Sequence, residues 1–375
     1  MMETDDRTFA PEAGHPDIQH KLLSAFRQGR LPHAFLFHGP EGCGKDAFAI
    51  ALAQLLNAAD ADGRIDASSS QYEKIAHLQH PDVKLVFPTP AKTNFKEAEF
   101  MEVLREKARN PYRRTAFPNK NTFIGIDTIR ELKAEARFTL YEGRRKVFII
   151  SEAEQMRVEA ANALLKLLEE PPGNLVLILV TANIYQILPT IKSRCQLLRF
   201  TPLPEAQMHD ILRRYHPKVD PGELSLLVRL SGYNLKRAFD FLDKNVLQIR
   251  EQAIDLLRKV VLIHRSQELM AILEPVAARQ NREDAQLLLW LLLLWFQDIL
   301  HLKQLEDASA KLYNPDKKDT LRKFMGFTPN ADITGIVWDI EGALQDLRDV
   351  RNFNPLLILM TLAIKLHQKL KKNKK

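Results

Sequence analysis

A glycine-rich loop lies between an expected strand and an expected helix near the start of the chain. Residues 39–46 read GPEGCGKD and match the phosphate-binding pattern G-x-x-x-x-G-K. An apolar run at 34–37 precedes the loop, and an amphipathic helical pattern follows it. In that setting glycines let backbone N–H groups face phosphate oxygens, and Lys45 reaches the outer phosphates. The loop therefore predicts a strand–loop–helix unit of the nucleotide-binding α/β class. Its glycines are Gly39, Gly42 and Gly44.

The position after the loop lysine departs from the pattern. It normally carries Ser or Thr, whose hydroxyl ligates Mg²⁺, and here it is Asp46. A carboxylate about 4 Å from a phosphate charge costs about 4 kcal/mol at an effective dielectric constant of about 20. That penalty equals about three decades of affinity. We therefore expect ATP and Mg²⁺ to bind weakly, or the loop to be retained for its fold with nucleotide binding lost.

A second departure follows the apolar strand expected at 147–150. Nucleotide-hydrolysing proteins of this class carry Asp-Glu there, whereas this sequence reads Ser151-Glu152. Glu152 keeps the carboxylate that orients a water molecule, but the metal-holding carboxylate is absent. Simple decay of the site is one interpretation. The other is an exchange, in which Asp46 and Ser151 supply the carboxylate and the hydroxyl from opposite sides.

The apolar runs of the first two hundred residues predict a parallel sheet covered by helices. They are continuous and rich in β-branched residues, as in strands buried on both faces. A helical pattern between the last two runs ends at prolines, which cannot continue it. We predict a three-layer α/β domain over 1–200, with an irregular insertion at about 88–122 that contains one helix near 97–109. The runs are 34–37, 83–87, 147–150 and 175–180.

Beyond residue 200 the strand signal disappears. The sequence is helical in pattern to its end, with breaks at 217–222, 231–232 and 314–315. We predict a small all-α module over 201–250 and a larger all-α module over 251–375 that ends in a basic tail.

Charge and cysteine content narrow the class of protein. The formal charge is +7, but six lysines lie in the last eleven residues, so the body is nearly neutral and gives no independent case for binding nucleic acid. Cys43 and Cys195 provide neither a disulfide framework nor a four-cysteine metal site. Residues 1–14 lack the features of a signal peptide, and the longest apolar run, 287–296, is too short to span a bilayer. We expect a cytoplasmic protein with no membrane contact and no metal site.

A third signal is the tripeptide Ser193-Arg194-Cys195, one helix after the strand expected at 175–180. This order places Arg194 at the edge of the nucleotide-type fold, where the ATP of a neighbouring subunit would lie. A planar guanidinium suits stabilisation of γ-phosphate charge, which is the role of an arginine finger. The alternative is an arginine in a surface ion pair.

Four segments have a distinctive sequence: LPHAFLFHGP at 31–40, EGRRKV at 142–147, ANALLKLLEEPP at 161–172 and SRC at 193–195. Taken together, these segments resemble the bacterial clamp-loader subunits of the AAA+ class. The resemblance covers about residues 30–200, and the helical remainder offers only the short matches 295–298 and 352–355. It implies an AAA+ P-loop domain, an all-α lid and an all-α C-terminal collar that joins a five-membered ring. Such a ring opens a sliding clamp and loads it onto primed DNA.

The resemblance also implies residue roles and partners. Members with an eroded ATP site and an intact Ser-Arg-Cys act on the ATP of the adjacent subunit, here through Arg194. The lid arginine of active members corresponds to Lys236, which keeps the charge but loses the bidentate fork. Thr181 takes the polar position at the end of the sensing strand. Expected partners are gamma/tau-type ATPases and delta, with the sliding clamp contacted indirectly and primed DNA through the assembled complex.

One departure from the family concerns zinc. Many relatives carry a four-cysteine zinc module after the P-loop helix, but residues 57–80 contain no cysteine. We therefore expect no zinc, and we expect His77 and His80 to be surface or turn residues.

Two other functions stay open. A self-sufficient P-loop ATPase or nucleotide kinase would need Lys45 for turnover and a working metal site. An independent DNA-binding protein would depend on loop arginines, for which solvated charge is the usual role. These arginines are Arg113, Arg114, Arg144 and Arg145.

Overall fold

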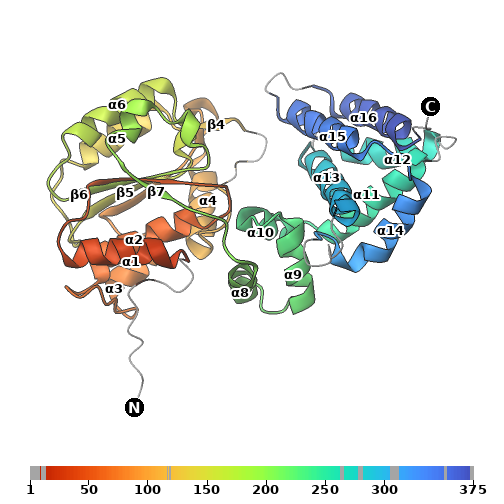
Figure 1. Ribbon diagram of the computed structural model, residues 1–375. Helices are drawn as coiled ribbons and strands as arrows, with labels where there is room; N and C mark the ends of the chain where they lie inside the picture. Colours follow the sequence, from red (N-terminus) through yellow and green to blue (C-terminus); the bar gives the residue numbers. More distant parts are fainter. Residues whose placement is uncertain are drawn as a thin grey trace, which may run out of the picture. The chain divides into compact units, whose positions relative to one another are not determined.

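The computed structural model divides the chain into two compact units. The first comprises Met1–Val219 and Tyr233–Phe239, and the second comprises Asp220–Gly232 and Asp240–Lys375. Figure 1 shows the sheet of the first unit and the helices of the second. The structure describes residues 9, 14–115, 117, 120–261, 266–277, 282–304, 312–349 and 353–371.

The first unit is built on a five-stranded parallel sheet with the strand order β2-β5-β6-β1-β7. The register aligns Phe37 of β1 with Val180 of β6, and Ile149 of β5 with Ile178 of β6. Every residue of β5 and β6 is buried, because helices cover both faces. The strands are β1 Ala34–His38, β2 Val83–Val86, β5 Lys146–Ile150, β6 Leu175–Thr181 and β7 Gln196–Arg199.

Helices cover the sheet on both sides, so the predicted three-layer α/β class is confirmed (Figure 1). Strand alternation divides the core: Phe35 and Phe37 of β1 point to one face, whereas Ala34 and Leu36 point to the other. One face carries α1 Pro16–Arg27, α2 Lys45–Ala58 and α3 Ser70–Ala76. The other carries α5 Ile126–Glu135, α6 Val158–Glu169 and α7 Pro189–Lys192.

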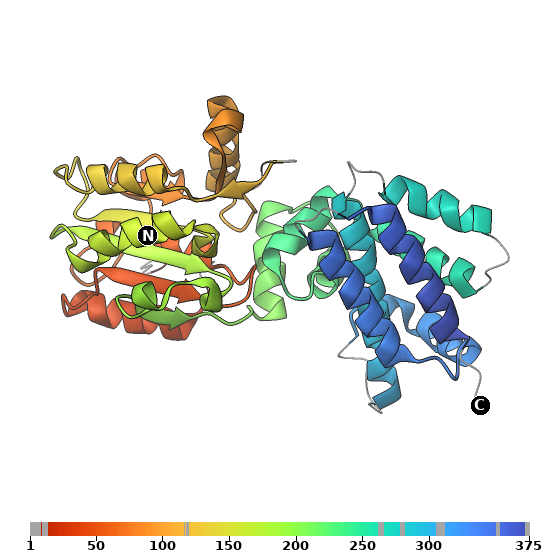
Figure 2. The same ribbon diagram turned by 90° about the horizontal axis from the view of Figure 1, so that it is seen from above.

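The insertion begins and ends at a short antiparallel pair of strands, β3 Thr89–Pro90 and β4 Thr122–Phe123. Between the two strands lies α4 Glu97–Arg109, which confirms the helix predicted near 97–109. Figure 2 shows α4 extending away from the sheet layers. Along α4 only Val103 and Lys107 are buried. A buried lysine on a mostly exposed helix requires a partner, and that partner lies in the candidate site.

Residues 201–250 are shared between the two units. Helix α8 Glu205–Tyr215 belongs to the first unit, and α9 Pro221–Leu230 belongs to the second. Helix α10 Leu235–Asp243 begins in the first unit, because Tyr233–Phe239 is assigned there. The three-domain boundaries at about 200 and 250 stay a prediction.

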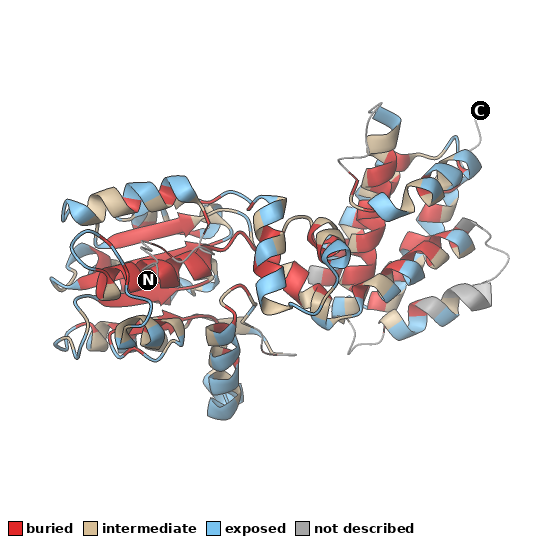
Figure 3. Ribbon diagram, turned by 90° about the horizontal axis from the view of Figure 1, so that it is seen from below, coloured by how far each residue is buried: buried red, intermediate tan, exposed pale blue. Residues whose placement is uncertain are grey.

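The second unit is a helical assembly around α13 Arg282–Gln304. By length and composition α13 is apolar enough to span a membrane, but 67% of its most apolar window is buried inside the unit, as in a core helix. Figure 3 shows this burial along α13 and in the sheet of the first unit. Besides α9, this unit contains the helices α11 Val246–Val261, α12 Ser266–Ala277, α14 Lys318–Phe327, α15 Ile333–Arg348 and α16 Pro355–Leu370.

Candidate functional site

The loop between β1 and α2 has a backbone that only glycine tolerates at two positions. Gly39 has φ of 150°, and an added Cβ would lie 2.2 Å from the carbonyl oxygen of Phe200. Gly42 has φ of 73°, and an added Cβ would lie 2.0 Å from Oδ1 of Asn234. Both contacts are far closer than van der Waals distance, so the glycines of the predicted loop are required by its packing.

The loop lysine is bonded to its own loop. Nζ of Lys45 donates to the carbonyl oxygens of Gly39 at 2.8 Å and Pro40 at 2.5 Å. It also lies 3.5 Å from Sγ of Cys43. The side chain is buried, so its ammonium group is satisfied by backbone carbonyls in this conformation.

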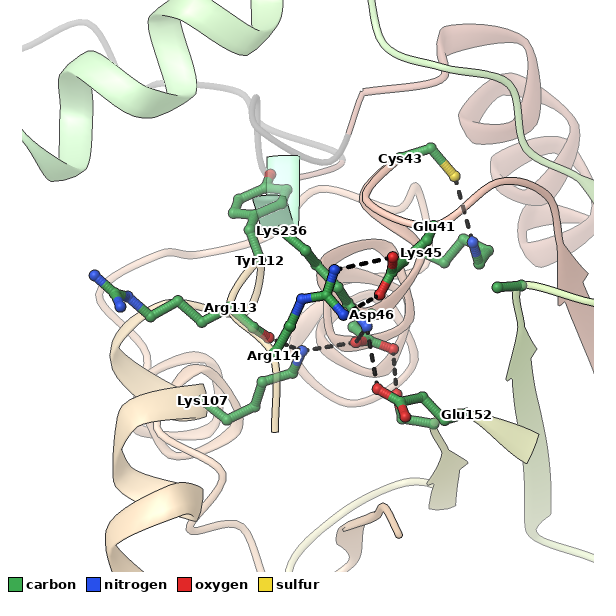
Figure 4. Close-up of polar contacts among 12 residues, drawn as sticks. Glu41, Cys43, Lys45, Asp46, Lys107, Tyr112, Arg113, Arg114, Glu152 and Lys236 are labelled. Carbon is green, nitrogen blue, oxygen red and sulfur yellow. Dashed lines mark hydrogen bonds and ion pairs between the residues drawn. The ribbon is translucent and has the colours of Figure 1, made fainter. Parts of the chain in front are cut away.

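Asp46, at the first helical turn after the loop, lies at the centre of a buried polar cluster (Figure 4). Its Oδ1 accepts a hydrogen bond from Oγ of Ser151 at 2.7 Å, and its Oδ2 accepts one from Nζ of Lys107 at 2.6 Å. Nζ of Lys236 lies 3.9 Å from Oδ2. Burial acts to raise the pKa of Asp46, but the two ammonium groups, Lys107 foremost, outweigh it and lower that pKa below its usual range.

Lys107 reaches this cluster from α4. Its side chain is only 1% exposed, and Nζ also donates to the carbonyl oxygen of Arg113 at 2.9 Å. Burial lowers the pKa of Lys107, and the Asp46 carboxylate opposes that effect. Neither partner faces water, so each charge depends on the other for its stability.

Lys236 joins the cluster from the segment Tyr233–Phe239. Its Nζ lies 3.3 Å from Oε1 of Glu152. Burial acts to lower the pKa of Lys236, but the nearby carboxylates of Asp46, Glu152 and Glu41 raise it overall. The segment is tied to the loop by Leu235, whose N–H donates to the carbonyl of Gly42 at 3.0 Å.

Residues 112–114 of the insertion lie against the loop. Arg114 pairs with Glu41 of the loop through two contacts, Nη1 to Oε1 at 2.9 Å and Nη2 to Oε2 at 3.1 Å. Tyr112 is buried, and its ring stacks on Phe239 with the centroids 6.4 Å apart. An added Cβ at Gly44 would lie 3.4 Å from Cε1 of Tyr112, which places the tyrosine ring directly beside the loop.

Arg194 lies between α7 and β7, next to the amino end of β7. Its side chain is 36% exposed, and Nη2 lies 2.7 Å from Oε1 of Glu169. Nη1 donates to the carbonyl of Thr190 at 3.0 Å. The surface ion pair that the sequence left as an alternative is therefore present, on a guanidinium that solvent still reaches.

A family model described as "DNA polymerase III, delta subunit" matches residues 14–204, just over half of the chain. The chain belongs to this family. The match covers the loop, Asp46, Lys107, Ser151, Glu152 and Arg194, whereas Lys236 lies outside it.

Three curated relatives are similar to this chain. The DNA polymerase III delta′ subunit of Pseudomonas aeruginosa is 33% identical over 61% of this chain and 61% of the relative. The delta′ subunit of Bacillus subtilis is 30% identical over 58% of this chain and 56% of the relative. The gamma/tau subunit of Mycobacterium tuberculosis is 30% identical over 63% of this chain and 37% of the relative. The chain thus spans between 37% and 61% of the length of these relatives.

The structure brings most of the expected site residues together, and of the expected residues only Lys236 lies outside the matched region. The loop glycines, Lys45, Asp46 and Ser151 are neighbours, and Glu152 and Lys236 complete the polar cluster. Thr181 is buried at the end of β6, paired in register with His38, and its Oγ1 accepts from the N–H of Asn183 at 3.0 Å. That hydroxyl serves a local turn.

Sequence reasoning missed Lys107, Tyr112 and the pairing of Arg114. A weak signal existed, because Phe100, Val103 and Lys107 follow the spacing of one helix face and place a lysine where an apolar residue is expected. Arg114 was interpreted as a solvated loop charge, and its pairing with Glu41 corrects this interpretation. His77 is exposed as expected, whereas His80 is buried in its turn, where Nδ1 accepts from the N–H of Asp82 at 3.0 Å.

The side chains around Asp46 do not suit a Mg²⁺ ion. Magnesium requires several oxygen ligands in near-octahedral geometry. Both carboxylate oxygens of Asp46 already accept bonds, and two ammonium groups lie within 3.9 Å of Oδ2. Across the described part of the chain, no group of three or more His, Cys, Asp or Glu residues is placed to hold a metal ion. The expected weakness of ATP and Mg²⁺ binding and the expected absence of zinc stay predictions.

Proposed function

We propose that this chain is a delta′-type subunit of the DNA polymerase III clamp loader. In this proposal it helps to load the sliding clamp onto primed DNA in the cytoplasm, its own nucleotide site is unproductive, and Arg194 acts on the ATP of the adjacent ATPase subunit. Its direct partners are gamma/tau-type ATPases and delta. It meets the clamp indirectly, and it meets primed DNA through the assembled complex.

The observation that carries the proposal is a contrast between two sites of one domain. Asp46, where the metal-ligating hydroxyl should be, is buried and neutralised from within by Lys107. Arg194 is exposed, and its ion pair with Glu169 involves two partly solvated side chains. An exposed pair of this kind contributes little to stability, so the guanidinium can exchange Glu169 for a phosphate group at small cost. The delta′ relatives at 33% and 30% identity support the same assignment.

The direct test is the clamp- and DNA-stimulated ATPase of a reconstituted loader that contains the Arg194→Ala chain. At the one ATP site that Arg194 serves, hydrolysis is expected to fall by about a thousandfold. The ATPase rate of the complex should therefore decrease by the contribution of that site, and the rate of clamp loading should decrease as well. Assembly, measured by size exclusion, is expected to stay intact.

Two controls make the test decisive. Arg194→Lys keeps the charge but loses the fork of donors, so it should restore only part of the activity. Arg105→Ala removes an arginine of α4 that is 64% exposed, and it should leave the ATPase unchanged. Normal stimulated ATPase and normal clamp loading with Arg194→Ala would refute the role of Arg194.

A second candidate is a self-sufficient ATPase of the gamma/tau kind, favoured by the relative at 30% identity with that name. It requires Lys45 and a working metal site in this chain. Steady ATP hydrolysis by the isolated chain that Lys45→Ala abolishes would favour this candidate. We expect no such activity, because Lys45 is bonded to Gly39 and Pro40 and the ligand positions around Asp46 are already filled.

A further inference from the structure

The segment 107–114 of the insertion lies against the phosphate-binding loop and Asp46. We propose that the ammonium group of Lys107 takes the place of a divalent metal ion there, and that the segment 107–114 keeps magnesium-bound nucleotide out of the chain's own pocket. The inference rests on one part of the proposed function, namely that the chain's own nucleotide site is unproductive. It is independent of the role of Arg194.

The first argument is position. Asp46 replaces the residue whose hydroxyl ligates Mg²⁺ in P-loop proteins, and Ser151 replaces the carboxylate that holds the ion from the neighbouring strand. In the structure these two side chains are bonded to each other at 2.7 Å. The remaining oxygen of Asp46 accepts from Lys107 at 2.6 Å. The groups that would hold the ion are therefore joined to each other and to a resident cation.

The second argument is charge. Two ammonium groups, Lys107 and Lys236, face two carboxylates, Asp46 and Glu152, within 3.9 Å. The cluster is balanced without any ion. A divalent cation entering beside Asp46 would meet two positive charges in a site with little water to screen them, and this repulsion disfavours its binding.

The third argument is closure. Beyond Lys107, the insertion is held by Arg114, which pairs with Glu41 (Figure 4). The buried ring of Tyr112 lies beside Gly44. Lys107 also binds the carbonyl of Arg113, which folds the segment back onto its own helix. The phosphate-binding loop is therefore covered by side chains of a separate segment. The residues at positions 46 and 151 are thus only one of two features that disfavour nucleotide binding, and the covering segment is the other.

The test restores the usual metal-ligating residue types at positions 46 and 151. It then asks whether nucleotide binds only when Lys107 is also removed. Three proteins are compared by calorimetric titration with Mg-ADP: the wild type, Asp46→Thr/Ser151→Asp, and the same pair with Lys107→Ala. We expect no binding by the wild type, and binding by the triple variant at least about 100-fold tighter than by the double variant. Equal affinity of the double and triple variants, a folded triple variant that does not bind, or micromolar binding by the wild type would each overturn the inference.

A matched control and a second measurement guard against a variant that merely loses its fold. Lys146 is also a buried lysine, but its Nζ binds the carbonyls of Glu135 and Phe138, so Lys146→Ala added to the double variant should not create binding. In the wild type, the modification of Lys107 by an amine-reactive reagent should be slow and unchanged by Mg-ATP. Faster modification in Mg-ATP would mean that nucleotide displaces Lys107, and it would contradict the inference. Neither result changes the Arg194 assay, which measures ATP in the neighbouring subunit.

Discussion

Nη2 of Arg194 lies 2.7 Å from Oε1 of Glu169, the last residue of α6. The two side chains are 36% and 46% exposed. The arginine proposed to serve a neighbouring subunit is thus held, in the isolated chain, by a carboxylate of the same chain. Because both groups are partly solvated, the ion pair orients the guanidinium but is weak enough for the guanidinium to exchange Glu169 for another anion.

The first prediction concerns this pair. Glu169→Gln removes the charge of the partner, and we expect the free energy of unfolding to change by less than about 1 kcal/mol, as for other exposed ion pairs. The stimulated ATPase of the reconstituted complex should stay within about threefold of normal, because Arg194 itself is retained. Urea unfolding and the complex ATPase measure the two effects. A loss of ATPase as large as that of Arg194→Ala would show instead that Glu169 is essential to the role of Arg194.

The second prediction concerns the buried pair of Lys107 and Asp46. Lys107→Met leaves the Asp46 carboxylate buried without its main partner and should destabilise the first unit by about 3–5 kcal/mol. Lys107→Met/Asp46→Asn removes both charges and should recover most of that loss. The unfolding in urea should be followed by circular dichroism and not by tryptophan fluorescence. All three tryptophans, Trp290, Trp295 and Trp338, lie in the second, helical unit, whereas the pair lies in the first. Equal destabilisation by the single and double variants would argue against the pairing.

The third prediction concerns the backbone of the loop. Gly42→Ala combines a φ of 73° with a Cβ placed 2.0 Å from Oδ1 of Asn234, so it should destabilise the first unit by about 1–3 kcal/mol. Gly173→Ala is the matched control, because nothing lies within 4 Å of an added Cβ there. Thermal unfolding compares the two variants. If they melt at the same temperature, the close approach of the loop to Asn234 is wrong.

The fourth prediction concerns pH. Burial, with a smaller contribution from Lys45, lowers the pKa of His15 below its usual 6.5, and its Nε2 lies 2.8 Å from the carbonyl of Cys43. The unfolded chain therefore takes up a proton near pH 6.5 that the folded chain resists. Stability contributed by neutral His15 is present above that pH and is lost as the pH falls below it.

His15→Asn tests this dependence. Asparagine tolerates the left-handed backbone of this position, where φ is 57°, but it does not titrate. The variant should lose less stability than the wild type between pH 7 and pH 5, as measured by urea unfolding at each pH. An identical loss in both proteins would mean that His15 is not the group responsible.

Local patterns predicted a large part of this molecule. Four of the five strands of the parallel sheet were predicted from continuous apolar runs, whereas β7 was not, and the helix at 97–109 was predicted inside an otherwise irregular insertion. Asp46 was assigned from the loop motif, and Ser151 and Glu152 from their place directly after an expected strand, whereas Lys236 was assigned only through the resemblance to clamp-loader subunits. The predictions made from local patterns each depend on residues that lie close together in the sequence.

The partners of charged residues could not be predicted in this way. Lys107 is 61 residues from Asp46 and Arg114 is 73 residues from Glu41, and no local pattern connects such positions. The sequence alone established that a phosphate-binding loop is present and that its two metal-ligating positions are altered. Only the tertiary structure decided what those altered positions contact, because the energy of a buried charge depends on which distant side chain the fold brings within bonding distance.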